Sequence, residues 1–224
     1  MAVIQDPDVA ANLLKVEATH KAGRTVVRPL SHGSLGQYSF GGFTGILPAA
    51  LGANSEIFQF RWTSANVAVI RSVKISASVT TTFFIAGVPV QIDMVKASAW
   101  SAAGTGGTAP TLSTTLKLQT STMGNSLIAA GDLRIATTAA LGAGTKTLEA
   151  NSLSAVLAGG PITASLNGTI IVPGTVLWEG SVGDGDHPLA LAQNEGFVIR
   201  SVAVPATGTW QAAIQVSWTE IASY

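Results

Sequence analysis

Alternation of apolar and polar residues near the C-terminus constrains the fold of this chain more than any other feature. Between Thr207 and Glu220, one side of the pattern carries large apolar residues and the other side carries polar ones. The apolar side comprises Trp210, Ala212, Ile214, Val216 and Trp218, and the polar side comprises Gln211, Gln215, Ser217 and Thr219. Because successive side chains of a strand point to opposite faces, this pattern predicts a half-buried β-strand.

A second apolar run, residues 197–204, comes just before this strand and ends at Pro205. Residues 205–208 read Pro-Ala-Thr-Gly, which is the composition of a short turn. Two strand-like runs joined by so short a turn usually pair with each other, so we expect an antiparallel hairpin here. Such a hairpin is a structural element, and its residues give no sign of a catalytic site.

Further strand-like segments fill most of the chain beyond Glu56. They cover residues 58–62, 67–79, 90–100, 112–120, 133–137, 162–166, 169–172 and 176–179. Asn167-Gly168 is the strongest short turn signal in the chain and predicts a tight hairpin between the two segments beside it. About ten short strands with turns at regular spacing are typical of a β-sandwich or barrel. We expect an all-β, jelly-roll-like β-sandwich.

The first 42 residues differ from the rest. Asp6 can cap a helix, Pro7 suits the first helical position, and apolar residues follow at helical spacing, so we expect a short helix over residues 7–17. Residues 21–42 are rich in glycine and show little periodicity, which predicts an extended arm laid across another surface. The expected domains are therefore an N-terminal arm with a short helix, residues 1–42, and a β-sandwich body, residues 43–224.

Charged residues are unusually scarce. They make up 11% of the 224 residues, while 47% are hydrophobic, and 12 basic side chains balance 12 acidic ones. Because surface charge keeps soluble monomers apart, we infer that other subunits cover much of the surface and expect a homo-oligomer, a trimer in preference to a dimer. The neutral balance argues against a nucleic-acid partner, which would require clustered Lys and Arg.

Several functional classes are excluded or disfavoured by what the chain lacks. It contains no cysteine, which excludes disulfides and thiolate metal sites. No window approaches the ~18 to 20 uninterrupted apolar residues of a membrane helix. The first residues lack the basic start and apolar stretch of a signal peptide. We therefore expect no membrane partner and no export by the signal-peptide route.

Three patterns could carry chemistry, and each has a simpler structural interpretation. Residues 184–187, Asp-Gly-Asp-His, lack the alternating carboxylates and closing Glu of a calcium loop, so we expect a polar turn. The Gly-rich residues 142–147 lack the Gly before Lys146 and the following helix of a phosphate-binding loop. The histidines occur without a Gly-x-Ser-x-Gly elbow; they are His20, His32 and His187. We expect no enzyme, and no cofactor or metal.

Five tryptophans could line a carbohydrate groove. Each lies in an expected strand beside apolar neighbours, so packing in the core or in a subunit interface is the favoured interpretation. They are Trp62, Trp100, Trp178, Trp210 and Trp218.

Several stretches carry a resemblance to a known class of protein. They are Arg28-Pro29-Leu30 leading to Gly36-Gln37-Tyr38, residues 58–62, residues 187–191 running into 195–200, and residues 207–210. With the arm and the C-terminal strands, they make the chain resemble a virion structural protein of a tailed bacteriophage. It is most similar to capsid decoration (cement) proteins with a jelly-roll or sandwich body. The resemblance spans most of the chain.

The resemblance implies oligomers seated on the major capsid protein lattice at the virion surface, after synthesis in the host cytoplasm. It also implies an arm that reaches neighbouring subunits, and no catalytic residues. We place the candidate interaction residues in the arm, at Arg24, Arg28, Pro29, Leu30 and Tyr38. Two alternatives stay open: a tail or fibre module that binds a host receptor, and a jelly-roll major capsid protein.

Overall fold

The computed structural model describes residues 35–48, 51–80, 89–110, 124–158, 170–180, 187–204 and 207–222. The chain divides into two units, Met1–Leu30 and Ser31–Tyr224, and every described residue belongs to the second. The expected helix over residues 7–17 lies outside the described residues, as do the expected strand 112–120 and the turn at Asn167-Gly168. Every helix or strand in the described part is a β-strand, which confirms the all-β class.

Twelve strands make up the described part of the chain. They are β1 (Gly36–Phe43), β2 (Leu47–Pro48), β3 (Ser55–Trp62), β4 (Val67–Val79), β5 (Val90–Ala102), β6 (Leu133–Ile135), β7 (Thr145–Leu148), β8 (Ser154–Ala158), β9 (Ile170–Glu179), β10 (Leu189–Leu191), β11 (Glu195–Ala203) and β12 (Thr209–Ile221). The two long β-branched runs of the sequence form β4 and β5, as predicted.

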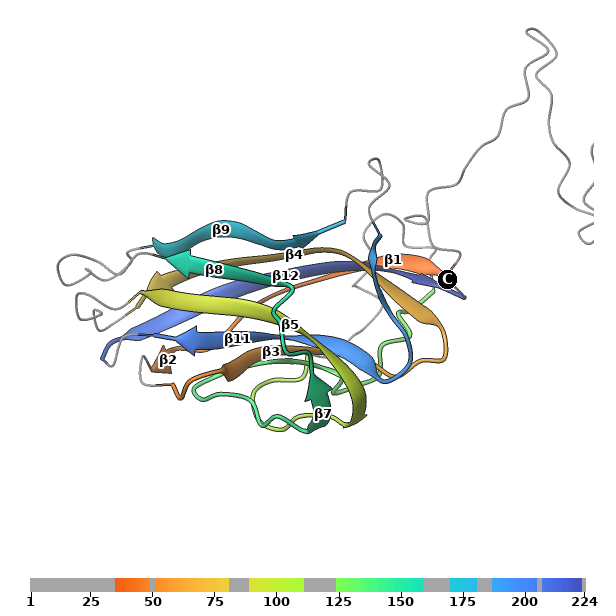
Figure 1. Cartoon of the computed structure of the whole chain (residues 1–224), viewed down its shortest axis with the longest axis horizontal. Helices are drawn as coiled ribbons and strands as arrows, with labels where there is room; N and C mark the ends of the chain where they lie inside the picture. Colours follow the sequence, from red (N-terminus) through yellow and green to blue (C-terminus); the bar gives the residue numbers. More distant parts are fainter. Residues whose placement is uncertain are drawn as a thin grey trace, which may run out of the picture. The chain divides into compact units, whose positions relative to one another are not determined.

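The strands form two antiparallel sheets (Figure 1). Sheet I has the order β1-β12-β4-β9, with β2 beside β12 and β10 beside β4. Sheet II has the order β3-β11-β5-β8, with β6 beside β3 and β7 beside β5. Eight strands remain when β2, β6, β7 and β10 are left out. Numbered from one to eight along the chain, they lie side by side in the order 1-8-3-6 in sheet I and 2-7-4-5 in sheet II. That order is a jelly roll, so the expected jelly-roll-like sandwich is confirmed.

The expected hairpin between residues 197–204 and 207–220 is wrong. β11 lies in sheet II between β3 and β5, whereas β12 lies in sheet I between β1 and β4. A short turn is compatible with either arrangement, and each strand has an apolar face of its own to bury. In a jelly roll these two strands belong to opposite sheets. The alternation predicted within β12 is confirmed over residues 210–218, where Trp210, Ile214 and Trp218 are buried, but Thr219, expected on the polar side, is also buried.

The body begins before the expected boundary at residue 43. Gly36–Phe43, of which residues 36–42 were assigned to the arm, pairs along its whole length with β12. Tyr38 and Phe40 point into the sandwich, and Gln37 and Ser39 point away from it. The glycines of this segment concealed the strand, because they interrupt the alternation that large side chains would have shown.

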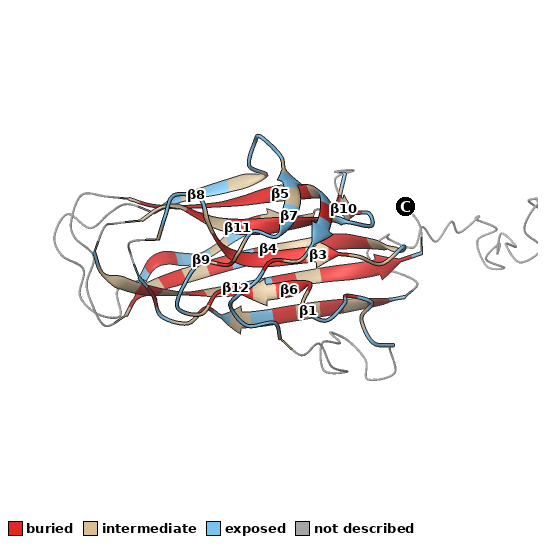
Figure 2. Ribbon diagram, turned by 90° about the horizontal axis from the view of Figure 1, so that it is seen from below, coloured by how far each residue is buried: buried red, intermediate tan, exposed pale blue. Residues whose placement is uncertain are grey.

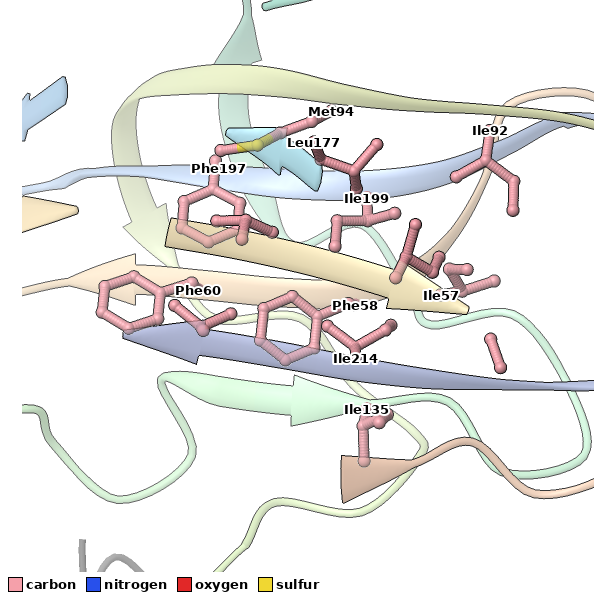
Figure 3. Close-up of a cluster of buried hydrophobic side chains, with 14 of the residues drawn as sticks. Ile57, Phe58, Phe60, Ile92, Met94, Ile135, Leu177, Phe197, Ile199 and Ile214 are labelled. Carbon is pink, nitrogen blue, oxygen red and sulfur yellow. The ribbon is translucent and has the colours of Figure 1, made fainter. Parts of the chain in front are cut away.

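Buried residues run along the strands of both sheets (Figure 2), and the core between the sheets holds aromatic side chains, such as Phe58, Phe60 and Phe197, among aliphatic ones (Figure 3). Phe60 stacks on Phe197 with ring centroids 5.3 Å apart, and it meets Trp218 of sheet I edge-on at 5.3 Å. Phe58 lies beside Phe197 and also contacts Phe40 of sheet I, at 6.0 Å in both cases. Rings from both sheets therefore interlock across the core. Four of the five tryptophans are fully buried and Trp178 is partly buried, which supports the packing interpretation.

Candidate interaction surface

Tyr38 is the only one of the five expected interaction residues that falls within the described residues. Its side chain is 1% exposed and stacks on Trp218 at 5.8 Å, so this residue packs inside the body. Its hydroxyl donates a hydrogen bond to the carbonyl oxygen of Gly124 at 3.1 Å. Burial, and then the charge of Glu220, raises the pKa of the Tyr38 phenol. The other four, Arg24, Arg28, Pro29 and Leu30, lie outside the described residues.

The Gly-rich loop that was compared with a phosphate site has another role. Lys146 Nζ forms an ion pair with Glu56 at 2.8 Å, and both side chains are less than a tenth exposed. The ammonium also lies 4.5 Å from the centre of the Trp100 ring. The carboxylate of Glu56 accepts a second hydrogen bond, from Gln59 Nε2 at 2.5 Å. Lys146 therefore ties its loop to sheet II.

The remaining candidate chemistry gathers no site in the described part of the chain. His187 is exposed and contacts the carbonyl oxygen of Pro188, while residues 184–186 lie outside the described residues. Among the residues that the structure describes, no three metal-ligating side chains come together. The same residues include no helix of the length and apolar character that crossing a membrane requires.

A row of alternating charges crosses the outer face of sheet II. Arg200 donates to both carboxylate oxygens of Asp93, from Nε at 3.0 Å and from a terminal nitrogen at 2.5 Å. The hydrogen bond with Asp93 raises the pKa of the Arg200 guanidinium. Ser152 also donates to Asp93, at 2.6 Å, and so holds the segment before β8. On the other side of Arg200, its β3 partner is Glu56.

Ion pairs in the described residues use charge to join segments of the body. Four pairs have nitrogen to oxygen distances of 3.2 Å or less, and in three of them the acid is nearly buried. They are Arg61–Asp132, Lys96–Glu195, Lys146–Glu56 and Arg200–Asp93. Several of the few charged side chains in this chain therefore pair with one another within the body, which leaves fewer unpaired charges on its surface.

The outer face of sheet I carries few charged side chains. Its positions are Ser39, Gly41 and Phe43 of β1; Gln211, Ala213, Gln215 and Ser217 of β12; Ser72, Lys74, Ser76 and Ser78 of β4; and Ile170, Val176 and Glu179 of β9. One cation and one anion stand among these fourteen positions. The others are small, amide or apolar, which is unusual for a sheet face exposed to water.

Exposed apolar side chains border a shallow depression on this outer face. Phe43 is 73% exposed and Ile170 is 68% exposed. Beside Phe43 lies a hollow of about 450 Å³ whose lining includes Gly42, Gly174 and Ala213. A second hollow, of about 320 Å³, adjoins it and extends to Ile170. The face thus has both protruding apolar groups and a hollow next to them.

Sequence reasoning identified part of this surface and missed the rest. The polar side of β12 was predicted, and it contributes Gln211, Gln215 and Ser217. Phe43 was missed because it closes a strand whose other residues, 36–42, had been assigned to the arm. Lys74 and Glu179 are more than 100 residues apart in the sequence, and only the pairing of β4 with β9 places them on neighbouring strands.

Comparison with known proteins gives no match for this chain, whether to a protein family, to a curated protein or to a solved structure.

Proposed function

We propose that this chain is a structural virion protein, a decoration protein that binds the major capsid protein and stabilises the capsid lattice. In this proposal it acts at the capsid surface as a homo-oligomer, after synthesis in the host cytoplasm. The observation that carries the proposal is the outer face of sheet I, which is almost uncharged and bears the exposed side chains of Phe43 and Ile170. A face of this kind gains free energy when another protein covers it.

The use of charge elsewhere in the body supports the same proposal. The buried pair between Lys146 and Glu56 joins β7 to β3, and the bidentate pair between Arg200 and Asp93 joins the neighbouring strands β11 and β5. Neither pair is placed to interact with a ligand in solution. Such internal fastening suits a protein that is exposed to mechanical or thermal stress as part of a shell.

The fold is compatible with the proposal but does not decide it. Jelly rolls occur in viral capsid proteins, lectins and cupins, so the architecture alone leaves several functions open. Packing against protein is favoured here over a sugar site because, among the described residues, the large aromatic side chains other than Phe43 are buried or partly buried in the body. A receptor-binding fibre module stays the principal alternative.

Adding the chain back to capsids that lack it tests the proposal. Purified full-length protein is mixed with such capsids, and bound protein is measured by co-sedimentation. The expected result is saturable binding and a higher temperature of capsid disruption. The matched control is the same titration on unrelated capsids. Absence of saturable binding would overturn the proposal, and binding to host cells instead would favour the fibre alternative.

A further inference from the structure

We infer that two copies of this chain join edge to edge, β1 against β1, about a twofold axis. This inference rests on the homo-oligomer of the proposed function and names its contact. The pairing uses the margin of sheet I and makes that sheet continuous across both copies, so its outer face stays open to a capsid protein. Three features of β1 support a second copy as the partner: its outward backbone groups, its unprotected edge and its fit to itself.

The backbone of β1 has hydrogen-bonding groups on a side that no described strand occupies. Among the described strands only β12 pairs with β1, which therefore lies at one margin of sheet I (Figure 2). Thr44, which follows β1, donates its amide to the carbonyl oxygen of Ala212 in β12. Residues bonded to one neighbour alternate along an antiparallel strand with residues that face the other way. The even-numbered residues of β1 therefore bond to β12.

The odd-numbered residues of β1 direct their amide and carbonyl groups outward. They are Gln37, Ser39, Gly41 and Phe43. The described part of the chain supplies these groups with no hydrogen-bond partner. A row of unpaired backbone groups of this kind is a template for a further strand.

β1 also lacks the features that protect the other sheet edges. Proteins protect an exposed edge with short strands, proline, bulges or charge. β9 contains Pro173 and breaks register with β4, β8 lies against β9, and β6 has three residues. By contrast, β1 has eight residues, contains no proline and pairs with β12 without a break in register. The sequence has no Lys, Arg, Asp or Glu between Arg28 and Glu56.

A second β1 satisfies the outward groups of the first. An antiparallel pair centred on Phe40 places Gln37 opposite Phe43 of the partner copy, and Ser39 opposite Gly41 of the partner copy. All four outward-facing residues then form hydrogen-bonded pairs, with two bonds in each pair. A shift by two residues in either direction leaves an outward-facing residue beyond the partner strand. Pairing of a strand with itself in this way is a twofold contact.

The side chains of β1 fit the same register. Two uncharged strands do not repel each other across the junction. On the outer face, Phe43 is 73% exposed and comes to lie over Gln37 and near Leu35 of the partner copy, which is 37% exposed. Diagonal neighbours on paired strands are within reach of an aromatic side chain. On the inner face, Tyr38 comes to lie opposite Gly42, so a large side chain meets the space beside a glycine.

The contact is narrow, which sets its expected strength. Eight residues span about 27 Å along the strand and the two sheets lie about 10 Å apart, so each copy contributes roughly 270 Å². The total is well below the ~1,200 Å² at which stable interfaces begin. We therefore expect a reversible dimer that forms as concentration rises. A single twofold pairing does not build the trimer predicted from the sequence.

Amide hydrogen exchange locates the contact, and sedimentation velocity over a concentration series measures dimerisation of the full-length chain. As the dimer forms, exchange should slow at the amides of Gln37, Ser39, Gly41 and Phe43. The amide of Phe40 bonds to β12 and should be protected at every concentration. A chain that stays monomeric throughout would overturn the inference, and so would a dimer or trimer that leaves the four outward amides unprotected.

Proline at Ser39 tests the role of the backbone. Ser39→Pro removes one outward amide from each copy and should weaken dimerisation about tenfold or more, because the dimer loses two hydrogen bonds. The body should melt at nearly the same temperature, since an edge strand tolerates proline where the N–H faces away from the sheet. Ser39→Ala keeps the amide and is the matched control, with dimerisation unchanged. Equal dimerisation of the proline and alanine variants, both folded, would contradict the pairing.

Charge at Ser39 gives a test that does not depend on proline. The register makes Ser39 of one copy the diagonal neighbour of Ser39 of the other copy. Ser39→Lys and Ser39→Glu should each weaken self-association about threefold, and an equal mixture of the two variants should restore it. No recovery in the mixture would refute this register.

Two further outcomes separate this inference from the proposed function. A chain that is monomeric alone and protects the four outward amides only on capsids would assign the edge of β1 to a capsid strand and overturn the inference. A dimer with the expected behaviour that fails to bind capsids would instead contradict the proposed function alone.

Discussion

Trp218 and Glu220 lie two residues apart on the same side of β12, and the indole Nε1 donates a hydrogen bond to Glu220 Oε1 at 3.0 Å. Neither side chain has exposed surface. The same carboxylate accepts hydrogen bonds from Ser126 Oγ at 2.6 Å and from the backbone amide of Leu127 at 3.0 Å. Glu220 therefore fastens the segment before β6 to the C-terminal end of β12, and the donors that it has among the described residues are all neutral.

Stability should depend on pH through Glu220. Burial raises the pKa of this carboxyl above its ordinary value of 4.5, and the hydrogen bonds from Ser126, Trp218 and Leu127 only partly oppose the rise. The folded state therefore binds the proton more tightly than the unfolded state does. The stabilisation from this group is fully present below the ordinary pKa and is lost as pH rises through the folded pKa.

Replacing Glu220 with glutamine isolates this effect. Across that pH window the free energy of unfolding should fall in the unaltered chain, with a limiting slope of about 1.4 kcal/mol per pH unit for one group. In Glu220→Gln the slope should be shallower, because an amide does not titrate. Urea melts at a series of pH values measure the slope. Glu149→Gln, at an exposed position, is the control, and equal slopes for Glu220→Gln and the unaltered chain would refute the assignment.

The two sides of β12 should respond very differently to truncation. Trp210→Ala should destabilise the fold by ~3 to 5 kcal/mol, since it leaves a cavity in the core. Gln215→Ala, on the exposed side of the same strand, should change stability by less than about 0.5 kcal/mol. Denaturant melts at a concentration where the chain is monomeric provide the comparison. Losses of similar size for the two variants would mean that the register of β12 is not the one described.

The long strands β4, β5 and β12 were predictable from this sequence, whereas the short strands β7, β8 and β10 and the pairing of the strands were not. The alternation in β12 and the β-branched runs of β4 and β5 reflect local burial, which periodicity records directly. Whether β11 pairs with β12 depends on which sheet each joins, and both have the same kind of apolar face. The partner of a strand is decided by packing over the whole sandwich, and a short turn does not encode it.

The candidate surface was predictable only in part for the same reason. The polar residues of β12 predicted an exposed face. Glu179, however, lies near Lys74 only because β9 pairs with β4. Glu56 gives a second example. The irregular pairing around Ile57 turns Ile57 and Phe58 together into the core and leaves Glu56 outward beside Arg200. A bulge of this kind changes which residues share a face, and no periodic pattern anticipates it.

Breaking the buried pair between Lys146 and Glu56 should be costly. Lys146→Met should destabilise the fold by ~3 to 5 kcal/mol, because it leaves the Glu56 carboxylate buried without its cation. Adding Glu56→Gln should recover part of that loss by removing the isolated charge. Thr147→Ala, an exposed neighbour on β7, is the control. If the double variant is no more stable than Lys146→Met in urea melts, the pair does not carry the energy assigned to it.

Removal of residues 1–30 should separate folding from assembly. The body contains its own core and its own ion pairs, and the division at Leu30 leaves β1 complete. The truncated chain should therefore unfold at nearly the same temperature as the full chain. Ordering a segment costs about 1 kcal/mol or more per residue, so an arm that acts as a clamp must gain that free energy from its partner. The same truncation should then abolish capsid binding, measured by co-sedimentation. A truncated body that folds and still saturates the capsid would show that the body alone makes the contact, and the clamp would have no role to explain.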